Sequence, residues 1–167
     1  NLQLTKRKIN AGIVIPITKN NAELSISFSD GTKIDGEMTI DRANLQDLQI
    51  EKISYKDKVG LNENAKKAIL EANYIIFGPG DYYTSILPNV VVDGFTETLA
   101  ESKAKIILPV NLINRRGHTT HWKVSDYVKV MESFLKKPID FILVNSEKPS
   151  SEQIERYKIT EDDGSLV

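Results

Sequence analysis

The chain has no cysteine among its 167 residues. This absence excludes disulfides and thiolate chemistry and fits a reducing cytoplasm, where we expect the protein to reside. No apolar run approaches the roughly 20 residues that a membrane-spanning helix needs, and no signal-peptide pattern is present, so we expect no membrane insertion. Basic residues are not in excess either, with 22 Lys and Arg against 23 Asp and Glu. We therefore expect no nucleic-acid partner.

Two common nucleotide-binding motifs are also missing. The sequence contains neither the G-x-G-x-x-G fingerprint nor a Walker motif, which argues against NAD-dependent chemistry and P-loop hydrolysis within this stretch. His118 and His121 lie three residues apart, but no cysteine and no clear third ligand accompany them. We therefore expect no zinc site.

The hydrophobic pattern divides the chain into a β-rich region (1–56) and a region of alternating strands and helices (57–167). We interpret both as parts of one partial domain. Hydrophobic residues make up 40% and charged residues 27% of the sequence, which is ordinary for a globular protein.

A small β-meander is predicted in the first region. Apolar residues alternate with serines over 24–29, the period-two pattern of a half-buried strand. Asp30-Gly31 follows, a dipeptide favoured in type I′ hairpin turns. The partner strand is predicted over 34–40, and a third strand over 49–55 completes the meander.

The second region predicts a three-layer α/β fold. Short apolar strands over 74–77, 105–110 and 140–144 recur at a spacing of about 30–35 residues, with helical patterns between them, which is typical of βαβ units. The strands do not alternate in polarity, so we expect a parallel sheet that is covered by helices and buried on both faces.

The run from Gly78 to Asn89 carries the strongest functional signal. It follows a predicted strand, places two glycines around a proline, and continues with hydroxyl groups where a helix begins. Outward backbone amides, a helix N-terminus and hydroxyl donors together suit a phosphate, although Gly-Pro-Gly alone is also an ordinary turn. The candidate ligand-binding residues of this run are Gly78, Pro79, Gly80, Asp81, Tyr83, Thr84 and Ser85.

Ligands of open parallel sheets bind at the carboxyl ends of the strands, so the loops that follow the three predicted strands should share one edge. The second loop contributes Asn111, which either ties down its own loop or contacts a ligand. Arg115 suits bidentate contact with an oxyanion, while a solvated pair with Arg116 is the alternative. Asp81 is either a capping residue, a ligand contact or an acid–base group.

The same run resembles a family motif. Gly78-Pro79-Gly80 followed by Tyr83-Thr84-Ser85-Ile86-Leu87-Pro88-Asn89 is similar to the G-P-G-S-x-Y-T-S-I-x-P-N segment of the 2-phospho-L-lactate transferase and gluconeogenesis-factor-like family (CofD/YvcK-like, UPF0052). The resemblance is closer to the gluconeogenesis-factor branch and covers nearly the whole chain. The other similar segments are 11–18, 100–104, Asn111 with Gly117 and Thr119, Ser125-Asp126, 143–145 and Glu155-Arg156-Tyr157.

The resemblance implies a Rossmann-like protein of about twice this length, whose N-terminal half, with a glycine-rich nucleotide loop, is absent from this sequence. It implies binding of a nucleotide sugar such as UDP-N-acetylglucosamine and a regulatory role in central carbon metabolism and cell-envelope synthesis. The transferase branch implies instead a Mg²⁺-dependent phosphoryl-group transferase that moves a 2-phospholactyl group in coenzyme F420 synthesis. The matching positions add Gly117, Thr119 and Tyr157 to the candidate ligand-binding residues. Whether the protein is an enzyme, and whether it forms a homo-oligomer, stays open.

Two departures from the family pattern affect the expected ligand. The family serine is Asp81 here, which places a negative charge beside the anion site. This change predicts either a bridging Mg²⁺, with Asp81 as its candidate ligand, or no tight phosphate contact. The family's Q-P-G-E-T is Arg115-Arg116-Gly117-His118-Thr119 here, and these arginines would balance Asp81 if the two loops met.

Overall fold

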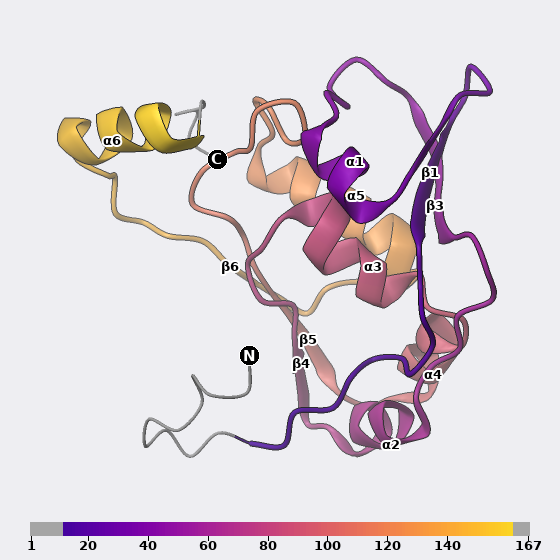
Figure 1. Ribbon diagram of the computed structural model, residues 1–167. Coiled ribbons are helices and arrows are strands. Elements are labelled where there is room, and N and C mark those ends of the chain that lie inside the picture. The colour runs from indigo at the N-terminus through magenta and orange to yellow at the C-terminus, as the bar shows by residue number, and fades with distance from the viewer. Residues whose placement is uncertain (1–11, 162–167) are drawn as a thin grey trace.

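The computed structural model describes residues 12–161, which form a mixed α/β fold (Figure 1). No helix in this range is both long and apolar enough to cross a membrane. The elements in chain order are β1 (Leu24–Phe28), β2 (Lys33–Asp35), α1 (Glu37–Arg42), β3 (Ile50–Tyr55), α2 (Glu63–Glu71), β4 (Tyr74–Ile76), the π-helical turn η2 (Tyr82–Ile86), α3 (Leu87–Val90), α4 (Phe95–Glu101), β5 (Lys105–Pro109), α5 (Val124–Leu135), β6 (Phe141–Leu143) and α6 (Ser151–Glu161).

The predicted meander is present as an antiparallel sheet in the order β2-β1-β3. Ser27 pairs with Lys33, and Gly31 takes a positive φ of 85° at the end of the turn. No residue other than Gly31 has a positive φ there, so the hairpin uses a three-residue turn closed by a glycine bulge rather than a type I′ turn. The predicted strand over 34–40 is wrong beyond Asp35, because Gly36 at φ 86° redirects the chain into α1.

The predicted parallel sheet is also present, in the order β4-β5-β6. Ile76 pairs with Ile107, and Leu108 pairs with Ile142. The chain moves across this sheet in one direction. Right-handed crossovers then place both connecting helical segments on the same face.

The three layers are therefore the parallel sheet, the helices and the antiparallel sheet, rather than helices on both faces of the parallel sheet (Figure 1). Ile106 and Leu108 are buried under the helices, and the Tyr55 hydroxyl of β3 donates to the Pro88 carbonyl of α3 at 2.9 Å. On the opposite face Ile76 is 61% and Phe141 51% exposed. Within residues 12–161 that face has no helical cover.

Candidate functional site

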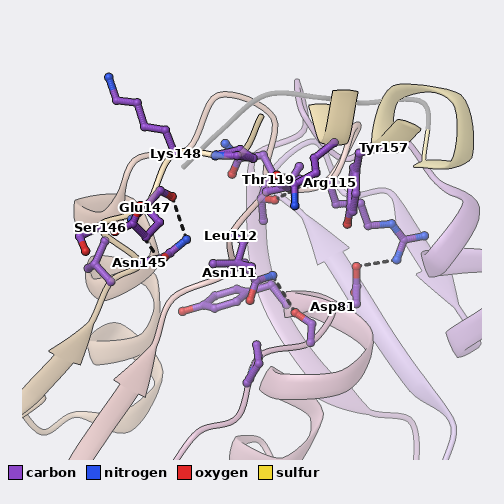
Figure 2. Close-up of a pocket in the computed structure, with 18 residues that line it drawn as sticks. Asp81, Asn111, Leu112, Arg115, Thr119, Asn145, Ser146, Glu147, Lys148 and Tyr157 are labelled. Atoms are coloured by element: carbon purple, nitrogen blue, oxygen red, sulfur yellow. Dashed lines mark hydrogen bonds and ion pairs between the residues drawn. The ribbon is translucent and has the colours of Figure 1, made fainter. Parts of the chain in front are cut away.

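A cavity of about 940 Å³ opens where β4, β5 and β6 end (Figure 2). The loops that follow these three strands meet there, as we expected from the rule that ligands of parallel sheets bind at the carboxyl ends of the strands (the strand-end rule). The residues proposed from the sequence that line it are Pro79, Gly80, Asp81, Asn111, Arg115, Thr119 and Tyr157. The cavity is also lined by Tyr82, residues 112–114, residues 144–149 and Gln153.

Five other proposed residues do not line the cavity. Tyr83 and Thr84 are buried inside η2, and Gly78 and Ser85 lie outside the lining. Gly117 packs against the segment after α1, where its carbonyl accepts the Leu45 amide at 2.6 Å. Gly117 has a φ of 77°, which explains the glycine on structural grounds.

The loop after β4 presents backbone amides at the start of η2. Asp81 caps this turn, because its Oδ1 accepts from the Thr84 amide at 2.9 Å and from the Thr84 hydroxyl at 2.6 Å. Among the described residues the amides of Gly80 and Asp81 have no hydrogen-bond acceptor. A Cβ on Gly80 would lie 3.3 Å from the Cβ of Ser85, so glycine permits this close turn. The two free amides are suited to an anion.

The Asn111 side chain holds this loop against the loop after β5. Its Nδ2 donates to the Gly80 carbonyl at 3.0 Å, a bond drawn in Figure 2. Asn111 therefore ties two walls of the cavity together, which agrees with a scaffold role.

Asp81 is the centre of an ionic network below the cavity. Its Oδ2 accepts from Nη1 of Arg115 (Figure 2) and lies 3.2 Å from Nδ1 of His118. Burial opposes ionisation, but the close approach of His118 and the hydrogen bonds from Thr84 and Arg115 hold the pKa of Asp81 well below its usual range. Asp81 is therefore ionised, and the two departures from the family motif are in direct contact with compensating charge.

His118 is buried between two acceptors. Its Nε2 lies 3.1 Å from the Ile40 carbonyl of α1, and its Nδ1 is at ion-pair distance from Asp81 without hydrogen-bond alignment. His121 is exposed, so the two histidines do not face one site.

Arg115 has a second acidic partner that the sequence did not reveal. Its Nη1 donates to Oδ1 of Asp41 at 2.7 Å, and its Nη2 donates to the Asp41 carbonyl at 2.7 Å. The bond to Asp41 is the main cause of the raised pKa of Arg115, and the same bond lowers the pKa of Asp41. Asp41 escaped prediction because α1 was not foreseen: the sequence pattern assigned residues 37–40 to a strand and left Asp41 outside any predicted element.

Aromatic rings of the core pack against Tyr82, the first residue of η2. The ring of Tyr82 lies edge-to-face with Trp122 at 5.4 Å and with Tyr127 at 5.3 Å between centroids. The Tyr82 hydroxyl also donates to the Tyr127 carbonyl at 2.6 Å. Trp122 therefore packs against the core.

A metal site does not emerge from the described part of the chain, where no three His, Cys, Asp or Glu residues are arranged to hold an ion. Both carboxylate oxygens of Asp81 already accept hydrogen bonds. A Mg²⁺ at this position would have to compete with Arg115 and Thr84.

Comparisons with known proteins agree with the resemblance found in the sequence. Residues 4–165 match the family model described as 2-phospho-L-lactate transferase CofD. The chain is 40% identical over 147 residues to a Thermotoga maritima protein named "Putative gluconeogenesis factor", covering 88% of this chain and 46% of the relative. A Streptococcus pneumoniae protein of the same name is 33% identical over 161 residues, covering 95% of this chain and 50% of the relative.

A solved structure shows the same architecture. The UPF0052 family protein of Bacillus halodurans superposes with a TM-score of 0.80 at 27% sequence identity, covering 93% of this chain and 50% of that one. The chain thus spans about half the length of the relatives that it matches.

Proposed function

The chain belongs to the CofD family, and we propose that its cavity binds a nucleotide sugar, such as UDP-N-acetylglucosamine, through the pyrophosphate. The observation that carries this proposal is the meeting of the free amides of Gly80 and Asp81 with Arg115 at one cavity wall. Amides at a helix start and a guanidinium are the usual protein partners of a phosphate. The names of the relatives point to gluconeogenesis, and we propose with them the regulatory role in central carbon metabolism and cell-envelope synthesis that the family resemblance implies.

The size and lining of the cavity fit such a ligand. A volume of about 940 Å³ falls within the range of roughly 300–1,000 Å³ that is usual for small-molecule and cofactor sites. Away from the anion wall, the loop after β6 contributes the neutral polar side chains of Asn145 and Ser146. The Ser146 hydroxyl is suited to a hydroxyl or amide of a sugar or base, while the Asn145 side chain is already bonded to the Glu147 backbone through both Nδ2 and Oδ1.

The charge of Asp81 does not oppose this proposal. Arg115 donates to its carboxylate, so the negative charge of Asp81 is paired within the protein. We therefore propose that this wall binds the pyrophosphate without a cation bridged through Asp81.

The second candidate is a Mg²⁺-dependent transferase of the 2-phospho-L-lactate type. The description of the matching family model favours it. In that case phosphoryl-type charge would be stabilised by a metal ion together with Arg115. The two candidates differ in turnover, since a regulator binds its nucleotide sugar without forming a product.

Thermal-shift and calorimetric titrations test both candidates. The ligands are UDP-N-acetylglucosamine, UDP-glucose, GDP and pyrophosphate, each with and without Mg²⁺. We expect a rise in melting temperature with the UDP sugars that R115A abolishes and that R116A, a change outside the cavity lining, leaves intact. A Mg²⁺-dependent shift with GDP and formation of product would favour the transferase, and no response to any ligand would refute both.

A further inference from the structure

The guanidinium of Arg115 is bound by a residue from α1, the helix that connects β2 and β3 of the antiparallel sheet. Asp41 lies in α1, 74 positions before Arg115, and it does not line the cavity. It accepts through both its carboxylate Oδ1 and its backbone carbonyl, each at 2.7 Å. The antiparallel unit, which consists of β1, β2, α1 and β3, thus contacts Arg115 in the cavity wall through Asp41.

The pattern of bonds leaves one edge of the guanidinium unused. Arg115 has five N–H donors, and Nη1 gives its two hydrogens to Asp41 and Asp81 while Nη2 gives one to the Asp41 carbonyl. The remaining Nη2 hydrogen and the Nε hydrogen have no acceptor among residues 12–161. These two donors are neighbours on one side of the planar group, the arrangement that binds an oxyanion in bidentate fashion.

Charge alone does not explain Asp41. Asp81 already provides one negative charge for Arg115, so a second carboxylate makes the surroundings less favourable to an anionic ligand. The benefit of Asp41 is orientation, since it fixes the Nη1–Nη2 edge and keeps the Nε–Nη2 edge available. Its side chain is 44% exposed, which limits the size of the effect.

We propose that Asp41 is a positioning residue, which holds Arg115 end-on so that the Nε–Nη2 edge receives a phosphate oxygen of the ligand. This inference rests on the proposed binding of a pyrophosphate-containing ligand in the cavity. It makes the antiparallel unit part of the binding site, although none of its residues lines the cavity.

Calorimetric titration of five variants (D41A, D41N, E37Q, R115A and D41A/R115A) tests the inference, with inorganic pyrophosphate and UDP-N-acetylglucosamine as separate probes. D41A should weaken binding of both by about threefold to fivefold, whereas D41N retains an acceptor oxygen and should keep most of the affinity. E37Q removes the same charge from the same helix at an exposed position and is the matched control. In the R115A background, D41A should have no further effect. A pure charge effect predicts the opposite, with D41A and D41N both binding more tightly than the wild type.

A second readout does not depend on any ligand. The Nε–H resonance of Arg115 in a nitrogen-15 NMR spectrum should be sharp in the wild type and in D41N, and should broaden in D41A as the side chain is released. An unchanged resonance in D41A would overturn the inference. Pyrophosphate binding that depends on Asp41, without binding of UDP-N-acetylglucosamine, would refute the proposed function alone. Binding of the nucleotide sugar that R115A abolishes but D41A leaves unchanged would refute the inference alone, and no binding of either probe would refute both.

Discussion

Arg115 donates from Nη1 to Oδ2 of Asp81, 34 residues earlier in the chain, and this bond joins the loop after β5 to the loop after β4. Only 12% of the Asp81 side chain is exposed, so the pair is largely shielded from solvent. The contact gives the cavity wall a fixed arrangement of charge before any ligand arrives.

The buried Asp81 carboxylate should make stability depend on pH. Because its pKa in the folded protein lies below the ordinary value of 3.8, its stabilisation is complete above a pH of about 5 and is lost as the pH falls below 3.8. D81N should lower the free energy of unfolding at pH 7 by about 1–3 kcal/mol and should flatten the acid limb of the stability curve. Thermal unfolding from pH 2 to 8 measures both. The control is D47N, the same change at an exposed position, and an equally steep acid limb in D81N would contradict the prediction.

Gly80 and Gly78 should respond differently to a methyl group. In G80A the new Cβ would meet the Ser85 Cβ at 3.3 Å, so the loop must shift by a few tenths of an ångström and the anion wall with it. We expect weaker binding of pyrophosphate and of the UDP sugars, with stability changed by about 1 kcal/mol or less. G78A is the matched control, since no atom lies within 4 Å of its added Cβ. Equal affinities in the two variants would show that the turn does not form the binding wall.

The hydroxyl of Tyr82 should contribute to stability rather than to binding chemistry. Y82F removes the 2.6 Å bond to the Tyr127 carbonyl inside the core, and we expect a loss of about 1–2 kcal/mol in the free energy of unfolding. Urea denaturation provides the measurement. Y74F loses the same hydroxyl from a side chain that is 61% exposed and should change stability by less than about 0.5 kcal/mol. A comparable loss in both variants would argue against this role of the buried bond.

Gly117 should prove structural. G117A forces alanine to a φ of 77° and brings its Cβ within 3.3 Å of the Asn44 side chain. We expect destabilisation by about 1–3 kcal/mol, with ligand affinity per folded molecule unchanged. Thermal unfolding together with calorimetry separates the two effects. G60A, at an open position without positive φ, should be nearly neutral; a selective loss of affinity in G117A would restore the ligand-binding assignment.

The local pattern of the sequence was sufficient for several elements. Alternating polarity and Asp30-Gly31 predicted the β1–β2 hairpin, and apolar runs predicted the parallel strands. The strand-end rule then gathered Gly80, Asn111 and Arg115 at one edge, because carboxyl ends of parallel strands meet there. These predictions succeeded since each depends on neighbours a few residues apart or on a general rule of topology.

Tertiary structure alone decided how the charges pair. Asp41 reaches Arg115 across 74 residues, and His118 is enclosed between Asp81 and the Ile40 carbonyl. No periodic pattern specifies such contacts, because they depend on how the antiparallel unit packs over η2. The one-sided covering of the parallel sheet has the same origin: local periodicity predicts that helices exist, while strand order and crossover hand determine which face they cover.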